Sequence, residues 1–597
     1  MLHSFFAIAG RCICILAGGW MAINADAAPP VIQDILPRGI AAGGTRAIEI
    51  RGTELGEITE VWTSFPTELK SEPVGNTAAT DAETAEPTPT DPSRYRCELT
   101  LAADQPVGVG AIRVATKDGV SPWHLFMVDD LPSVAESGVH DQMANAQDLA
   151  WPIAVDGTSD AFKSDFYRLE LKAETELSFE VVAQRIGSPL DTVLTLFNEM
   201  GEPLVVSDDE PSSGADSRFV FRVPTAGVYF LALRDVQHRG GADYRYRLRV
   251  GRFPLIRCVY PLGSDNESLA SLDFVNADDS ILKPSADLRA RFDSEQGGPV
   301  IDGGPGTRGG PVTLSLKPAD HDASGFTTMP AEPSIDSVLE QEPNGEREHA
   351  VALPVPGIAY GRFAQEQDVD FYQWTAAEGQ RVVVTAESQH YGSPADVYLR
   401  LWTEAGVMLA EGSSQGAQRT QLTYAATKAG KVFLSAEDLQ QRGGAAYAYR
   451  LAIEVDPPAF TLTTDGDTFN VAQNGTLVVK VTAKRTGEKG PIELSLQSAE
   501  VGALEGVTLE QNVIAEGANV LEFKAKLPST WNPGELHRVK IVGSVSGGEG
   551  SPRQVVSTLP AIEARGVDGM RVPQFLDGAM VIGVTPATPS PEKTEEK

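Results

Sequence analysis

The sequence predicts an all-β protein made of tandem β-sandwich domains. Short runs of β-branched and aromatic residues alternate with polar residues, and they end at Gly, Pro or Asp at regular intervals. No segment carries a long helical period. One stretch of domain length also occurs twice in the chain, which indicates a modular protein.

The repeated stretch is defined by short motifs that return in the same order. A repeat of this length is a duplicated domain rather than a short solenoid unit. A catalytic site usually occurs once, whereas binding and spacer modules are often reiterated, so the duplication favours a non-enzymatic protein. The matched pairs are Asp165-Phe166-Tyr167 with Asp370-Phe371-Tyr372, Gly187-Ser188-Pro189 with Gly392-Ser393-Pro394, Asp191 with Asp396, Asp235 with Asp438, Arg239-Gly240-Gly241 with Arg442-Gly443-Gly444, and Tyr244 with Tyr447.

Length and charge narrow the class of protein. The 597 residues are enough for about four domains. The chain has 82 acidic and 49 basic residues and a net charge of −33, and a surface this negative repels nucleic acid and anionic lipid. Such a charge suits a soluble protein outside the cell, and it suits the binding of cations. We therefore expect no nucleic-acid partner.

The N-terminus has the pattern of a secretory signal. A mostly apolar run from Cys12 to Ala22 follows Arg11, and Ala25-Asp26-Ala27 has the small-x-small pattern of a cleavage site. Residues 1–27 are predicted to be a signal peptide of a secreted, periplasmic or cell-surface protein, with an uncleaved anchor as the alternative. No later stretch is long and apolar enough to span a bilayer, so no transmembrane segment is expected.

Beyond the signal, the first predicted sandwich occupies residues 29–132. The alternating run Ile48–Arg51 is followed by glycine, as is typical of a strand that enters a turn. The Thr-, Pro- and Glu-rich stretch 71–93 is predicted to be a loop or a disordered insertion, and strands resume at Cys97. Cys97 and Cys258 are the two cysteines outside the signal, and they either pair or remain as buried free thiols.

The other predicted domains follow in order. Residues 133–252 and 336–455 are the two repeat copies, each a β-sandwich. Residues 253–335 include a Gly- and Pro-rich part and are predicted to be a degenerate small β or loop region. Alternation is clear again in 456–565, which predicts an immunoglobulin-like sandwich, and the Pro-, Thr-, Glu- and Lys-rich tail 566–597 is predicted to be disordered.

Two parts of this pattern resemble known families. The opening Ile35-Leu36-Pro37-Arg38-Gly39, with a following Gly-x-x-Leu, resembles the IPT/TIG immunoglobulin-like fold. In both repeat copies, Asp-Phe-Tyr, Gly-Ser-Pro-x-Asp and Arg-Gly-Gly-x-x-Tyr-x-Tyr resemble the bacterial pre-peptidase C-terminal domain. That family is a jelly-roll-like sandwich found beside secreted peptidases, and the resemblance implies the same fold here. With the first module added, the arrangement resembles exported proteins of Planctomycete-type bacteria.

One group of residues has the chemistry of a metal site. Glu340, Glu342 and Asn344 alternate on the segment before the second copy, and Asp368 and Asp370 alternate at the start of its first strand. Alternation on extended backbone points side chains to the same side, and calcium prefers six to eight hard oxygen ligands. The resemblance implies the same assignment, because the collagen-binding relative in clostridial collagenases binds calcium through a Glu-x-Glu-x-Asn linker and an Asp-x-Asp strand.

A simpler interpretation of the same residues remains open. Asp370 would then cap a turn, and the other four side chains would be solvated. The first copy departs from the pattern, because its linker offers only Glu136 and Asp141 and because Ser164 precedes Asp165. On the metal interpretation, we expect calcium binding in the second copy and no equivalent site in the first.

Other candidate residues have structural explanations. The repeated Asp191, Asp235 and Arg239, with their second-copy counterparts, are expected to order loops. Tyr244 and Tyr246, with Tyr447 and Tyr449 in the second copy, alternate along the last strand, of which one face is core and the other is either packed or an exposed aromatic strip.

Catalytic motifs are weak in this sequence. Residues 412–416 match G-x-S-x-G, but they lie in a predicted turn between strands rather than before a helix. No His-Glu-x-x-His occurs, and the eight histidines are scattered. The sequence therefore favours a secreted, non-catalytic protein for adhesion or for binding an extracellular polysaccharide or protein. The alternative is an accessory or component of a secreted peptidase system.

Overall fold

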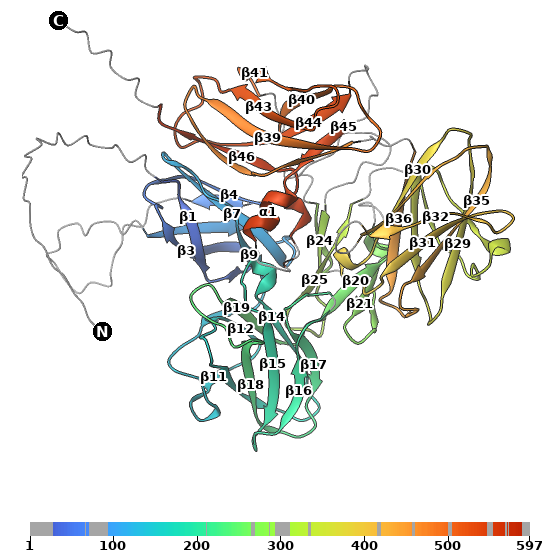
Figure 1. Ribbon diagram of the computed structural model, residues 1–597. Coiled ribbons are helices and arrows are strands. Elements are labelled where there is room, and N and C mark those ends of the chain that lie inside the picture. The colour runs from blue at the N-terminus through green and yellow to red at the C-terminus, as the bar shows by residue number, and fades with distance from the viewer. Residues whose placement is uncertain are drawn as a thin grey trace, which may run out of the picture.

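The computed structural model describes residues 28–587 with internal gaps, and within these residues the regular secondary structure is nearly all β-strand (Figure 1). The all-β prediction is confirmed. The predicted signal 1–27, nearly all of the polar insertion 71–93 and the last ten residues lie outside the described part. The internal gaps are 66, 71–92, 211, 264–268, 286, 293–310, 332–335, 415–418, 456–459, 500–503, 546–552, 567–569 and 571.

The first domain packs two small sheets face to face around a core that includes Ile50, Leu99 and Phe126. Their strand orders are β1-β3-β6-β5 and β2-β9-β7-β4, with β8 paired to β7. The strands are β1 (Val31–Leu36), β2 (Gly39–Ile40), β3 (Gly44–Thr53), β4 (Ile58–Thr63), β5 (Thr67–Lys70), β6 (Arg94–Leu101), β7 (Gly108–Thr116), β8 (Gly119–Val120) and β9 (His124–Val128).

The second domain is the first repeat copy, and it has two five-stranded sheets. Their orders are β10-β12-β19-β14-β17 and β11-β13-β18-β15-β16. Its elements are β10 (Ser133–Ala135), η1 (Met143–Asn145), β11 (Gln147–Leu149), β12 (Ile153–Thr158), β13 (Asp165–Leu171), β14 (Glu176–Val182), η2 (Gln184–Ile186), β15 (Thr192–Asn198), β16 (Pro203–Ser207), β17 (Arg218–Arg222), β18 (Gly227–Asp235) and β19 (Arg245–Gly251).

The second repeat copy has the same topology. Its sheets run β26-β28-β36-β30-β34-β33 and β27-β29-β35-β31-β32, so every strand of the first copy has a counterpart. Its elements are β26 (Ser337–Leu339), η5 (Arg347–His349), β27 (Val351–Ala352), β28 (Gly357–Arg362), β29 (Val369–Ala376), β30 (Arg381–Glu387), η6 (Gln389–Tyr391), β31 (Val397–Thr403), β32 (Met408–Glu411), β33 (Ser413–Ser414), β34 (Arg419–Ala425), β35 (Gly430–Asp438) and β36 (Ala448–Val455).

The region between the copies forms small β-sheets within its described residues. It contains two three-stranded sheets, β20-β21-β22 and β23-β24-β25, which share a buried core that includes Val259, Phe274 and Leu314. Much of the Gly- and Pro-rich part of this region lies outside the described residues. The elements are β20 (Ile256–Tyr260), η3 (Leu269–Ser271), β21 (Asp273–Asn276), β22 (Ile281–Leu282), β23 (Arg289–Phe292), β24 (Pro311–Leu316) and β25 (Gly325–Pro330).

The last domain extends beyond the boundary that the sequence predicts. Strand β46 (Met580–Thr585) pairs with β38 and β44, and Ile582 and Val584 lie in the core. The prediction of a disordered tail from residue 566 is therefore wrong for this strand. The other elements are β37 (Phe460–Thr464), β38 (Thr468–Ala472), β39 (Thr476–Arg485), β40 (Ile492–Ser498), β41 (Thr508–Gln511), β42 (Val513–Ile514), β43 (Val520–Lys526), β44 (Leu536–Val545), β45 (Arg553–Ser557), α1 (Leu559–Arg565) and η7 (Gln574–Leu576).

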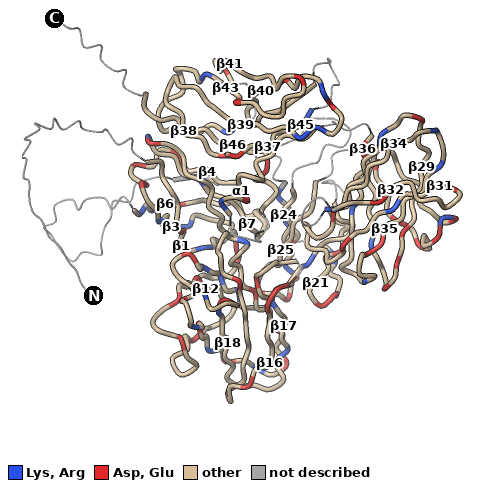
Figure 2. Tube along the Cα trace, viewed as in Figure 1, with Lys and Arg blue, Asp and Glu red and all other residues tan. Residues whose placement is uncertain are grey.

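The domains contact one another through buried ion pairs. The last domain lies against the first (Figure 1), where Arg113 of β7 pairs with Asp467 at 3.0 Å. Acidic residues occur in each domain along the trace (Figure 2), so the negative charge is not confined to one module. The buried ion pairs between domains give the predicted sandwiches defined interfaces.

Two arginines on the same face of β19 form the most buried of these contacts. Arg247 and Arg249 are fully buried, and both pair with Asp129, which follows the last strand of the first domain. Arg249 also pairs with Glu180 at 2.6 Å and donates a hydrogen bond to the Ser324 carbonyl at 2.8 Å. One side chain therefore connects the first domain, the first repeat copy and the middle region.

Replacing Arg249 with Ala should lower the free energy of unfolding by about 3–5 kcal/mol, because Asp129 and Glu180 would stay buried with part of their charge uncompensated. Urea unfolding followed by circular dichroism measures this change. The control is Arg252→Ala, which removes a half-exposed ion pair with Asp322 and should cost about 0–1 kcal/mol. Equal losses in the two variants would contradict the importance of the buried network.

Candidate metal centre

The linker that enters the second repeat copy is fixed against β29, which lies next to β27 in one of the two sheets. After β26, residues 340–344 cross towards the start of β29, and the Phe371 N–H donates a hydrogen bond to the Asn344 carbonyl at 3.0 Å. This bond places Asn344 beside Asp370, which occupies the second position of β29. Two segments that are well separated in sequence thus present polar side chains to one another.

The structure brings together three of the five predicted metal ligands. One oxygen each from Glu342, Asp368 and Asp370 lies within 4.8 Å of the others. Asp370 and Asn344 are fully buried, and within the described residues neither Asp370 Oδ1 nor Asn344 Oδ1 has a hydrogen-bond partner. Buried oxygens without donors are unfavourable, and a hard cation would satisfy them.

Glu340 lies next to this group but is not one of the three residues whose oxygens lie within 4.8 Å of one another. Its Oε1 accepts hydrogen bonds from the Arg362 N–H at 2.8 Å and from the Tyr260 hydroxyl at 3.3 Å. Its Oε2 lies 3.5 Å from the Tyr449 hydroxyl, which also donates to Asp370 Oδ2. Glu340 therefore supports Asp370 through a shared tyrosine, and its Oε2 still faces the cluster.

Burial makes these carboxyl groups hold protons unusually tightly. It raises the pKa of Asp370 to about 9, with the nearby charge of Glu340 as the next cause. It also raises the pKa of Glu340 to about 7. A cation bound between them would favour the ionised carboxylates and displace these protons. The cluster thus has the electrostatics of a site for a positive ion.

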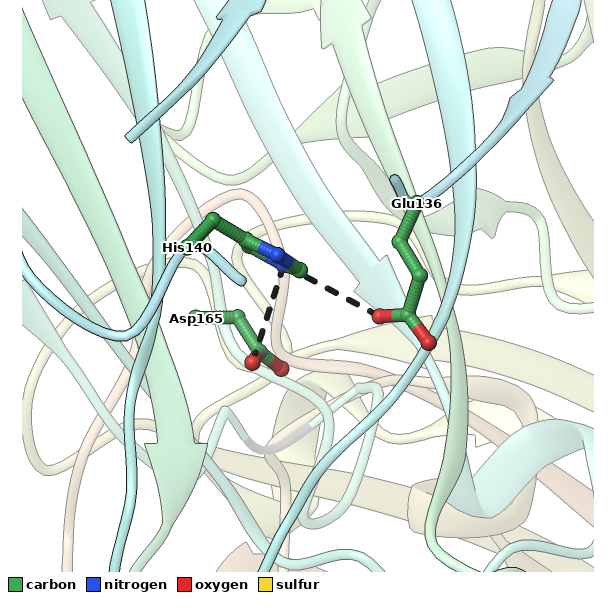
Figure 3. A group of neighbouring side chains, drawn as sticks. All are labelled: Glu136, His140 and Asp165. Atoms are coloured by element: carbon green, nitrogen blue, oxygen red, sulfur yellow. Dashed lines mark ion pairs between the residues drawn. The ribbon is translucent and has the colours of Figure 1, made fainter. Parts of the chain in front are cut away.

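The first copy contains a cluster that the sequence analysis did not expect. Glu136, His140 and Asp165 point towards one another (Figure 3), and their ligand atoms also lie within 4.8 Å of one another. His140 Nε2 is 3.7 Å from Asp165 Oδ1 and 3.9 Å from Glu136 Oε2. This cluster offers an imidazole and two carboxylates, and the expectation that the first copy has no equivalent calcium site stays a prediction.

The framework around this cluster repeats that of the second copy. The Phe166 N–H donates to the His140 carbonyl at 2.7 Å, as Phe371 does to Asn344. Tyr246 donates to Asp165 Oδ2 at 2.9 Å, as Tyr449 does to Asp370. The sequence does contain a signal for this cluster: Glu136 and His140 have the same spacing as Glu340 and Asn344. It was missed because histidine is not an oxygen ligand.

The other repeated polar residues order loops, as the sequence analysis proposed. Asp235 accepts hydrogen bonds from the backbone N–H groups of Asp191, Gln237 and Arg239. Asp438 holds the matching loop of the second copy in the same way. Tyr246 and Tyr449 are fully buried, and the tyrosines two residues before them pack partly against the cores, so the structure favours packing over an exposed aromatic strip.

The remaining sequence candidates carry no assembled site among the described residues. Ser413 and Ser414 pair with β34 as a short strand, and residues 415 and 416 of the serine motif lie outside the described part. Cys97 and Cys258 are buried free cysteines. Among the helices of the described residues, none is long and apolar enough to cross a membrane.

Comparison with known proteins gives structural likenesses only. No protein-family model and no curated protein matches the chain. The pre-peptidase C-terminal domain of a Bacillus anthracis collagenase is similar over 19% of this chain and 99% of its own length, at 14% identity and a TM-score of 0.16. A periplasmic inhibitor of g-type lysozyme from Aeromonas hydrophila is similar over 20% and 94% of the two chains, at 16% identity and a TM-score of 0.14.

A larger solved structure is similar over more of the chain. It is the M60 catalytic domain with two CBM51 domains from Clostridium perfringens, and the likeness covers 71% of this chain and 46% of that one. The identity is 9% and the TM-score is 0.15. These values carry no functional argument, so the function is argued from the residues.

Calcium should protect the linker of the second copy from hydrogen exchange in the intact protein. An ion that binds only the folded form adds about 2.7 kcal/mol of stability at a hundredfold excess over Kd. Exchange mass spectrometry with calcium and with chelator should show slower exchange in residues 340–376. Asp370→Asn should abolish this difference, because it removes a buried ligand oxygen. Equal exchange of the wild type in both conditions would remove calcium from this site.

Calcium affinity at this site should rise with pH. Asp370 and Glu340 hold protons up to about pH 9 and pH 7, so binding at neutral pH releases protons. Because these pKa values are raised in the folded state, the ion-free site is most stable below about pH 4 and loses stability as pH rises towards 9. Titration calorimetry at pH 6 and pH 8, in two buffers of different ionisation enthalpy, measures the calcium affinity and the number of protons released on binding. A pH-independent affinity would contradict the assignment.

Proposed function

We propose that this chain is an exported, non-catalytic protein for adhesion or for binding an extracellular polysaccharide or protein, with calcium bound in its second repeat copy. The two copies are taken as pre-peptidase C-terminal-type sandwiches, and the first domain as an IPT/TIG-like module. The observation that carries the binding role is that the same edge strand exposes apolar side chains in both copies. The predicted signal and the strongly negative charge support export.

The edge strands are β16 in the first copy and β32 in the second. Each hydrogen-bonds to one neighbouring strand within the described residues, β15 or β31 respectively. Leu204 and Val206 are 41% and 62% exposed on β16, and Met408 and Leu409 are 50% and 36% exposed on β32. An edge strand with exposed apolar side chains is suited to pair with an extended polypeptide. Of the two ligand classes, a protein therefore fits these strands better.

The proposed calcium site would fix how the second copy is presented. Its linker contacts the middle region through the hydrogen bond from Tyr260 to Glu340, and it contacts β29 through Asn344. A cation that joins the linker to β29 would reduce the freedom of the second copy relative to the middle region. Two binding strands held at a fixed separation bind a repetitive ligand more tightly than either alone.

A solid-phase screen of the intact protein against polysaccharides and extracellular proteins tests the proposal. We expect retention on a protein ligand, and a loss of at least about tenfold when Leu204 and Leu409 are both replaced by Lys, because charge on an edge strand blocks pairing. Val478→Lys is the control, because Val478 is 47% exposed on β39, which has strands on both sides. No retention on any surface, with hydrolytic activity in the same preparation, would favour a peptidase-associated role instead.

A further inference from the structure

The two homologous clusters differ in the kind of ligand atoms that they offer. Where the second copy has Glu342, Asn344 and Asp368, the first has Gly138, His140 and Lys163 at the matching positions. The Lys163 ammonium pairs with Asp160 at 3.0 Å. The first copy has therefore lost side-chain oxygens and gained an imidazole, so it cannot provide the six to eight oxygens that calcium prefers from its side chains.

The orientation of His140 suits a metal ligand. Its Nδ1 lies 3.2 Å from the Gly138 carbonyl, which can accept only from a protonated Nδ1, so the lone pair of the neutral ring is on Nε2. Nε2 faces the two carboxylates and has no hydrogen-bond partner among the described residues, and His140 is 6% exposed. Histidine ligands usually donate their other ring N–H to a carbonyl or carboxylate in this way.

Each carboxylate is also held so that one oxygen faces His140. Asp165 Oδ2 accepts the Tyr246 hydroxyl at 2.9 Å, which leaves Oδ1 towards the imidazole. Glu136 Oε1 accepts the Thr158 N–H at 3.0 Å, which leaves Oε2 towards the imidazole. The three donors are thus oriented before any ion binds.

We propose that Glu136, His140 and Asp165 form a site for a borderline divalent ion such as Zn²⁺, distinct in ion preference from the oxygen-rich cluster of the second copy. Imidazole and carboxylate together suit zinc, and donors about 2.1 Å from a tetrahedral ion lie about 3.4 Å apart, close to the 3.7 and 3.9 Å seen around His140 Nε2. The Glu136 side chain is 29% exposed, so the ion has a route from solvent. A water completes the coordination.

The test measures zinc bound to the intact protein after dialysis against micromolar zinc in the presence of millimolar calcium. His140→Gln should lose one bound zinc per chain, and Glu136→Gln should lose the same one. Cobalt provides a second readout, because a four-coordinate site with imidazole gives visible absorption that His140→Gln should abolish. Circular dichroism of both variants checks that the first copy remains folded.

The matched control is Asp370→Asn in the second copy. It should keep the zinc of the first copy and lose only the calcium response, so failure of the calcium proposal and failure of the zinc proposal are distinguished. Equal zinc uptake by wild type and His140→Gln would overturn the zinc site. Nuclear magnetic resonance spectra that show a protonated His140 ring, unchanged by added zinc, would also overturn the zinc site. In that case His140 would itself supply the positive charge between the carboxylates.

Discussion

Both clusters depend on one buried tyrosine hydroxyl in each repeat copy. Tyr246 lies 2.5 Å from the Tyr167 hydroxyl and donates to Asp165, and Tyr449 makes the same contacts with Tyr372 and Asp370. These hydroxyls connect the core of the sandwich to the strand carboxylate. The linker glutamate of each copy also lies within hydrogen-bond reach of the same hydroxyl. The site is therefore built on the packed core rather than on a mobile loop.

The same tyrosines explain a glycine that recurs on the neighbouring strand. A Cβ at Gly157 would overlap the Tyr246 ring and approach the Glu136 carboxylate, and a Cβ at Gly361 would overlap the Tyr449 ring and approach Glu340. Both glycines leave room for the tyrosine and the linker glutamate to meet. With this framework held constant, the chemistry of each site is set by a few exchangeable positions on the linker and just before the strand. The two copies thus differ in the donor atoms of their clusters without a change of fold.

The sequence predicted features that depend on local periodicity. Alternation and turn residues indicated the β-sandwich class, and Asp370 is the second residue of β29 with Asp368 directly before the strand, although β29 is not the first strand of the copy. Strand β46 was missed because its partners are distant in sequence. It pairs in parallel with β38 and antiparallel with β44. The first-copy cluster was not predicted because calcium prefers oxygen ligands and histidine offers nitrogen. It is the tertiary fold that places His140 beside Asp165.

The interfaces between domains follow from a different constraint, the burial of charge. Arg247 and Arg249 alternate on β19 with core residues, and an isolated sandwich would expose such arginines to water. Here Asp129 of the first domain joins Asp156 and Glu180 of the first copy around them, so separation of the two domains would break both ion pairs of Asp129. In the second copy Ala452 pairs opposite Ile358 and Thr385, where the first copy has Arg249 opposite Ala154 and Glu180. The first copy is thereby tied to its neighbours by ion pairs that the second lacks at this position, whereas the second copy packs on the middle region through a buried apolar cluster that includes Cys258, Tyr391 and Ala446.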